Sequence, residues 1–157
     1  MTAAAAPHRL NLGPILRARV VYPVLRTVSI ALGVFVAVVS LVDDPSAATG
    51  SGGLVADWVS RLLFGTPDYG DKVAHFAAYA ALSLVTVLAF GRHRRSAAIV
   101  LVLLVLFGGA LELAQAAGGV RTGDWLDVLA NTLGTVAGGA LGATARVIVR
   151  RLEISPA

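Results

Sequence analysis

Four apolar runs, each long enough to cross a lipid bilayer, constrain the fold of this chain more than any other feature. They cover about residues 24–42, 72–90, 96–117 and 125–146. A membrane-spanning helix needs roughly 20 mostly apolar residues, and lipid cannot pair with free backbone groups, so each run is predicted to be an α-helix. Only 14% of the residues are charged, against about 25% in soluble domains. We therefore predict an all-α integral membrane protein that folds as a four-helix bundle.

The flanking segments leave room for one membrane domain and no second domain. Residues 1–22 carry Arg9, Arg17 and Arg19 without a periodic apolar pattern, which predicts a basic cytoplasmic tail lying against anionic headgroups. The membrane domain is expected over residues 23–149, and residues 150–157 are expected to form a short cytoplasmic tail. The chain has no cysteine, which excludes disulfides and thiolate chemistry, and we expect no cofactor.

Two segments in the first half of the chain each admit two interpretations. The first apolar run is predicted to be a retained helix that Arg26 lengthens by snorkelling. Its basic start, short apolar centre and small residues at 46–48 also fit a cleaved signal peptide. Residues 54–64 place apolar side chains on one helical side, with Asp57 and Arg61 on the other. That segment is expected either to lie flat in the membrane interface or to pack on the bundle as an ordinary loop helix.

The basic residues are distributed unevenly over the two ends of the predicted spans. Ten of the thirteen lie on one side of a four-span arrangement, and eight of the nine acidic residues lie on the other. Because loops rich in arginine and lysine stay in the cytoplasm, both termini and the turn at residues 91–95 are predicted to be cytoplasmic. The basic surface is then charge at the membrane edge, which argues against a nucleic-acid partner.

Polar residues gather where three of the spans meet the outer side of the membrane. They are Asp71, Lys72, His75 and Tyr79 around the start of the second span, Glu112 and Gln115 in the third, and Arg121, Asp124, Asp127 and Asn131 around the start of the fourth. At ~1.5 Å per residue, all of them lie within roughly 10 Å of the outer surface. Ionisable groups inside a membrane are expensive and by default face a cavity or a partner. The sequence therefore predicts an outward-facing polar pocket between these three helices.

This set of side chains predicts proton transfer or the binding of a charged group. Four carboxyl groups face two fixed cations, Lys72 and Arg121, so a protonated His75, protonated carboxyls or a bound cation must supply the missing positive charge. We predict His75, Glu112 and Asp127 as candidate acid–base residues. The predicted binding residues are Asp71, Lys72, Tyr79, Gln115, Arg121, Asp124 and Asn131. The set contains one histidine and no thiol, so zinc is a weak candidate, and no metal site is predicted.

Several of these residues also have purely structural interpretations. Asp71 and Asp124 could cap the helices that they precede or open. Tyr79 could be a packed aromatic, and Lys72 and Arg121 could anchor the chain at the membrane interface. Capping does not account for the polar residues inside the spans, for which a hydrogen-bonded network that locks the bundle is the alternative.

Gly134, Gly138 and Gly142 repeat every four residues along the fourth span. A row of small residues on one helical face lets two helix backbones approach closely. We expect this face to pack inside the bundle, and the oligomeric state stays open.

Three motifs in this order, DKxxHxxxY, ExxQ and RxxDxxDxxxNxxG, resemble the VanZ-like family of bacterial integral membrane proteins. They correspond here to Asp71, Lys72, His75 and Tyr79; Glu112 and Gln115; and Arg121, Asp124, Asp127, Asn131 and Gly134. The resemblance covers about residues 25–145. It implies a four-helix bundle in the bacterial cytoplasmic membrane and an association with resistance to teicoplanin, a glycopeptide that binds cell-wall precursors. It does not imply a reaction.

The leading hypothesis is a cell-envelope protein whose pocket binds or modifies a lipid-linked or peptidoglycan-related group. Its expected partners are membrane lipids and a lipid-linked cell-wall precursor. The residues alone leave open whether the protein is an enzyme. The alternative is a non-enzymatic scaffold or binding protein in which the same polar residues hold the helices together. A transporter is ranked third. Many transporters are built from internal repeats, and the four predicted spans show none.

Overall fold

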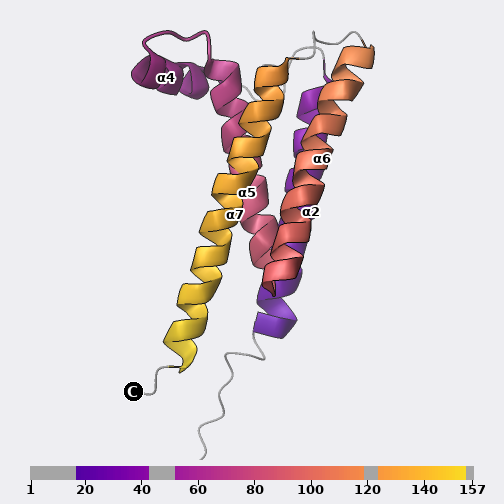
Figure 1. Ribbon diagram of the computed structural model, residues 1–157, viewed down its shortest axis with the longest axis vertical. Helices are drawn as coiled ribbons and strands as arrows, with labels where there is room; N and C mark the ends of the chain where they lie inside the picture. The colour runs from indigo at the N-terminus through magenta and orange to yellow at the C-terminus, as the bar shows by residue number, and fades with distance from the viewer. Residues whose placement is uncertain (1–16, 43–51, 119–123, 155–157) are drawn as a thin grey trace, which may run out of the picture.

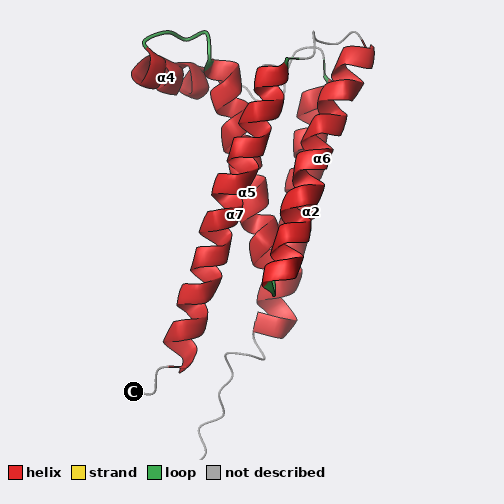
Figure 2. Ribbon diagram, viewed as in Figure 1, coloured by secondary structure: helices red, strands yellow, loops and turns green. Residues whose placement is uncertain are grey.

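The described part of the chain consists of helices joined by short turns. The structure is a computed structural model that describes residues 17–42, 52–118 and 124–154, and these residues contain no strand (Figure 2). The elements are η1 (Arg17–Val21), α2 (Tyr22–Leu41), α4 (Gly52–Phe64), α5 (Gly70–Phe90), α6 (Arg94–Gly118) and α7 (Trp125–Ile154). The predicted all-α fold is thus confirmed.

Four of the helices run side by side along the long axis of the molecule (Figure 1). α2, α5, α6 and α7 are each long and apolar enough to cross a membrane, which confirms the four predicted spans. Pro23 lies in the first turn of α2, where its missing N–H group costs no helical hydrogen bond. Two ends differ from the prediction, because η1 precedes α2 and α7 continues to Ile154 instead of ending near residue 146. Residues 150–154, expected in the tail, are therefore helical.

The outer surfaces of the bundle are apolar, as lipid contact requires. Large hydrophobic side chains on the spans are exposed, among them Ile30, Leu106, Leu113, Leu141 and Ile148. The apolar core is small by comparison and joins three spans: its fully packed residues are Val36, Tyr79, Leu82 and Leu111. In a membrane such exposure is favourable, so the helices are held together mainly by close packing and polar contacts.

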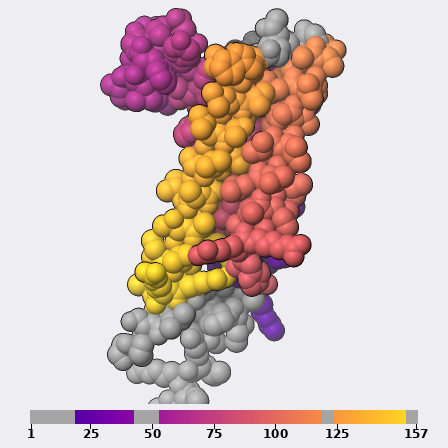
Figure 3. Space-filling model, viewed as in Figure 1, coloured from indigo at the N-terminus to yellow at the C-terminus, as the bar shows by residue number. Residues whose placement is uncertain are grey.

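α4 lies across one end of the bundle and stands out from it in the space-filling view (Figures 1 and 3). Ala56 and Ser60 are buried, and the Asp57 carboxylate lies directly against Gly70 at the start of α5. Most of the other apolar side chains of α4 are exposed: Leu54, Val55, Trp58, Leu62, Leu63 and Phe64. α4 therefore packs on α5, and its exposed apolar face also favours a position in the membrane interface.

α7 packs on α5 through its row of glycines, as predicted. Gly134 lies against the Phe76 carbonyl and Gly138 against the Ala80 carbonyl, so closely that a Cβ atom at either glycine would overlap the neighbouring backbone. Gly142 continues the same contact further along. The two helices start at the same end of the bundle and run in the same direction, so this contact holds their first turns next to each other.

Candidate functional site

Seven polar residues from three helices meet at the end of the bundle where α5 and α7 begin. This polar cluster consists of Asp71, Lys72 and His75 on α5, Glu112 on α6, Asp124 just before α7, and Asp127 and Asn131 on α7. The parallel packing of α7 on α5 brings residues 71–75 beside residues 124–131. α6 runs in the opposite direction, so its last turns reach the same end.

Lys72 is the shared counter-ion of the polar cluster. Its Nζ atom lies 2.6 Å from Oδ1 of Asp127, 2.7 Å from Oδ2 of Asp124 and 3.2 Å from Oδ2 of Asp71. The Asp127 side chain is only 8% exposed, and a buried carboxylate is stable only with such a partner. Lys72 thus joins α5 to α7 and does more than anchor the chain at the membrane interface.

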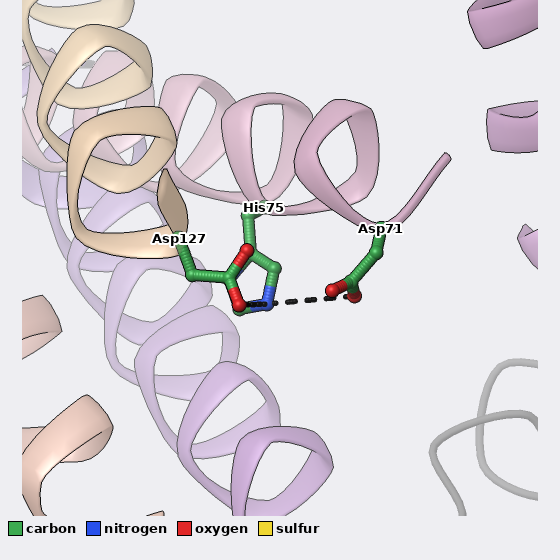
Figure 4. A group of neighbouring side chains, drawn as sticks. All are labelled: Asp71, His75 and Asp127. Carbon is green, nitrogen blue, oxygen red and sulfur yellow. Dashed lines mark ion pairs between the residues drawn. The ribbon is translucent and has the colours of Figure 1, made fainter. Parts of the chain in front are cut away.

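A hydrogen-bonded chain orients His75. Asn131 donates from Nδ2 to Oε1 of Glu112 over 3.3 Å, which leaves its Oδ1 to accept from Nδ1 of His75 over 3.0 Å. The proton of a neutral His75 therefore resides on Nδ1. Its Nε2 atom then points between Oδ1 of Asp71, at 3.7 Å, and Oδ2 of Asp127, at 4.0 Å (Figure 4).

This arrangement attracts positive charge to Nε2 of His75. A lone pair that faces two carboxylate oxygens is repelled unless a proton or a cation lies between them. Ligand atoms of Asp71, His75 and Asp127 all lie within 4.8 Å of one another, so these three residues could hold a metal ion. The ammonium group of Lys72 already lies against two of these residues, Asp71 and Asp127.

Asp124 has two partners, one for each carboxylate oxygen. Its Oδ1 accepts from the Leu126 N–H over 2.9 Å, which confirms the predicted cap of α7. Its Oδ2 is ion-paired with Lys72, and this ammonium holds the pKa of the Asp124 carboxyl below its usual range. The corresponding cap prediction for Asp71 is wrong: Tyr69 is the N-cap of α5 and no side chain caps it. Asp71 lies in the first turn instead.

Two of the residues predicted for the site, Tyr79 and Gln115, do not join the polar cluster. Tyr79 is 1% exposed and packs against Gly108, and its hydroxyl has no hydrogen-bond partner among the described residues. Gln115 donates from Nε2 to the Ser40 carbonyl and so ties α6 to α2. Arg121 lies outside the described residues.

One lateral contact was not predicted. The hydroxyls of Ser29 on α2 and Thr86 on α5 are 2.8 Å apart, and Thr86 donates to the Leu82 carbonyl. Ser29 is one of the few polar side chains in the first apolar run, and a hydroxyl inside a span was the available signal. This contact holds α2 against α5 on the far side of the core from the polar cluster.

The fold and the polar cluster together define a class of protein: a multi-pass helical membrane protein with a buried network of ion pairs and hydrogen bonds at one end of its bundle. The model of the VanZ/LLP1 family matches residues 24–146. The chain belongs to the VanZ/LLP1 family, which confirms the resemblance seen in its motifs. It is thus a VanZ-like membrane protein, of a kind linked in general to glycopeptide resistance. The match includes all of α5 and α6, most of α2 and α7, and the whole polar cluster. No curated protein and no solved structure matches the chain.

Proposed function

We propose that the polar cluster binds, and in an enzymatic version modifies, a lipid-linked or peptidoglycan-related group on the outer side of the bacterial cytoplasmic membrane. Through this activity the protein would raise tolerance to the glycopeptide teicoplanin. The observation that supports the proposal is the concentration of seven polar residues, joined by ion pairs and hydrogen bonds, at one end of a bundle of long apolar helices. Lys72, together with Arg121, would orient an anionic group of the ligand.

The geometry of His75 favours a role in proton transfer. A proton accepted by Nε2 would form an imidazolium between the carboxylates of Asp71 and Asp127. On the other side of the ring, Asn131 links Nδ1 to Glu112 and fixes the orientation of the imidazole. His75 would then act as the base toward a ligand hydroxyl, and Asp127 or Glu112 would stabilise the charge that results.

A structural lock is the second candidate function, and one observation favours it. Lys72 and Asn131 connect α5 to α7 and α6 by direct contacts, without any ligand. In that version the protein binds or scaffolds a partner elsewhere on its surface. Loss of one network residue would then reduce stability and function together.

Two conservative variants, His75→Gln and Glu112→Gln, distinguish these functions. If the cluster acts chemically, both variants should insert into the membrane, and their melting temperatures should lie within a few degrees of the wild type. Both should nevertheless lose the teicoplanin tolerance that expression of the wild-type protein confers. The measurements are membrane abundance, the melting temperature in detergent and the inhibitory concentration of teicoplanin. Asp68→Asn, an exposed carboxyl at the same end, is the control and should keep full tolerance. A fall in melting temperature that parallels the loss of tolerance would support the lock.

The outward orientation of the polar cluster has its own test. The chain has no cysteine, so a single introduced cysteine is the only thiol. Asp68→Cys should react with a membrane-impermeant maleimide on intact cells, and His93→Cys should react only after the membrane is opened. Both positions are exposed. The opposite labelling pattern would place the polar cluster on the cytoplasmic side and exclude the proposed ligand.

A further inference from the structure

The opposite end of the bundle gathers guanidinium groups on two aromatic rings. Cζ of Arg92 lies 5.0 Å from the ring centroid of Tyr22, and Cζ of Arg146 lies 5.8 Å from the same centroid. Cζ of Arg26 lies 5.4 Å from the centroid of Phe90. These three arginines come from α2, from the turn between α5 and α6, and from α7. Cation–π contact attracts each guanidinium to its ring, but it does not cancel the repulsion between the arginines.

Backbone carbonyls hold the arginines in place without neutralising them. Arg146 donates from Nη1 to the Leu88 carbonyl over 2.6 Å, and Arg150 donates from Nη2 to the Arg92 carbonyl over 2.6 Å. Among the described side chains, every ion pair involves Lys72 or His75 at the other end. The three guanidinium groups therefore form no ion pair with another side chain that the structure describes.

A cavity of about 350 Å³ lies between α2, α5 and α6. Its lining residues are Ser29, Ile30, Gly33, Val34, Ala37, Leu82, Thr86, Leu104 and Phe107. The only hydroxyls in this wall, those of Ser29 and Thr86, are hydrogen-bonded to each other, so the wall is effectively apolar. Ile30 and Val34 are more than half exposed, which leaves the cavity open toward the surrounding lipid.

Helical spacing places the cavity next to Arg26 and its ring partner Phe90. Arg26 precedes Ile30 by four residues on α2, and Phe90 follows Thr86 by four residues on α5, so each pair shares a helical face. The distance along α2 from Arg26 to Ala37 is about 16 Å at ~1.5 Å per residue. This is close to half of the roughly 30 Å hydrocarbon core, which is the depth of one leaflet.

We propose that this surface binds one anionic glycerophospholipid, with its phosphate on Arg26, Arg92 and Arg146 and one acyl chain in the cavity. The phosphate would supply a counter-ion for the three guanidinium groups, and planar guanidinium groups bind phosphate oxygens well. The acyl chain matches the apolar wall in both chemistry and depth. This lipid site is separate from the polar cluster, and it depends neither on the outward orientation nor on the proposed function.

The headgroup part is tested with a matched pair of double variants. Wild-type protein in a non-ionic detergent is titrated with dioleoyl phosphatidylglycerol or dioleoyl phosphatidylcholine, and bound lipid is counted by native mass spectrometry. Arg92→Gln/Arg146→Gln should weaken phosphatidylglycerol binding roughly thirtyfold, as expected for two basic side chains at a headgroup. Arg94→Gln/Arg151→Gln removes the same charge from two exposed residues without a ring contact, and should weaken it less than threefold. Equal losses in both pairs, or equal binding of phosphatidylcholine by the wild type, would overturn the site.

The acyl-chain part is tested by filling the cavity. A Cβ atom at Gly33 would touch only Leu82, at an ordinary 4.0 Å, so Gly33→Leu can occupy the cavity without disturbing backbone packing. This variant should lose at least tenfold in affinity for the dioleoyl lipid and keep its affinity for inorganic phosphate. Gly109→Leu, on open helix surface, is the control for folding. Displacement of the dioleoyl lipid by equimolar inorganic phosphate would show a phosphate site alone and overturn the lipid assignment.

Discussion

Replacing Lys72 by methionine is expected to lower the free energy of unfolding by roughly 3 kcal/mol, near the low end for breaking a buried ion pair. Its ammonium group is the partner of three carboxylates within 3.2 Å. Without it, Asp127, which is almost fully buried, must become protonated or remain as an unpaired charge. Asp71 and Asp124 are each about a third exposed, so water compensates part of their loss. The measurement is the unfolding midpoint in mixed detergent.

A double variant separates this electrostatic effect from the loss of packing. Asp127→Asn removes the charge that Lys72→Met leaves unpaired, so the pair of changes should recover at least 1 kcal/mol of the loss, the scale of couplings between contacting residues. Lys72→Leu removes the same ammonium and should behave like Lys72→Met. If Lys72→Met unfolds at the same midpoint as the wild type, Lys72 is not the counter-ion that holds α5 to α7.

Replacing Gly138 by alanine should cost about 2–3 kcal/mol and reduce the amount of protein in the membrane. The new methyl group would overlap the Ala80 carbonyl, and backbone atoms cannot move aside as a flexible side chain can. Alanine otherwise favours a helix over glycine by about 1 kcal/mol, so the expected loss is opposite in sign to the intrinsic effect. Unfolding midpoint and membrane abundance are the two measurements.

Gly109→Ala provides the matched control for this prediction. Gly109 also lies within a span, but a Cβ atom there meets nothing within 4 Å. The control should be as stable as the wild type or slightly more stable. If Gly138→Ala and Gly109→Ala gave the same midpoint, the close contact between α7 and α5 would be wrong.

The sequence predicts the spans well because a bilayer imposes one strict requirement on length and apolar character. The position of the glycine row and the convergence of His75, Glu112 and Asp127 follow from helical periodicity combined with the order of the spans. Helix ends were less well predicted. α7 has no glycine or proline to stop it between residue 146 and Ile154, and its arginines remain favourable in the last turns of a helix.

The individual partners of the site residues could not be predicted from spacing. Gln115 is three residues from Glu112 on one helical face, yet it bonds to the Ser40 carbonyl on α2. The order of helices around the bundle decides this contact, and no local pattern encodes that order. The position of Tyr79 also depends on a neighbouring helix, because Gly108 on α6 is small enough to let the ring pack in the core. The Tyr79 hydroxyl has no hydrogen-bond partner among the described residues.

The contact between α5 and α7 has a mechanical consequence. Gly134–Phe76, Gly138–Ala80 and Gly142–Leu84 are each 58 positions apart, as are the hydrogen-bonded pairs Arg146–Leu88 and Arg150–Arg92. The backbone carbonyls of α5 contact every fourth residue of α7, and three of these residues are glycines. A small slide of one helix along the other would therefore press the carbonyls against larger side chains. Only a jump of a full turn, ~5.4 Å, would restore the fit. We therefore expect α5 and α7 to move together as one unit that joins the two ends of the bundle, so that any opening motion would involve α2 or α6.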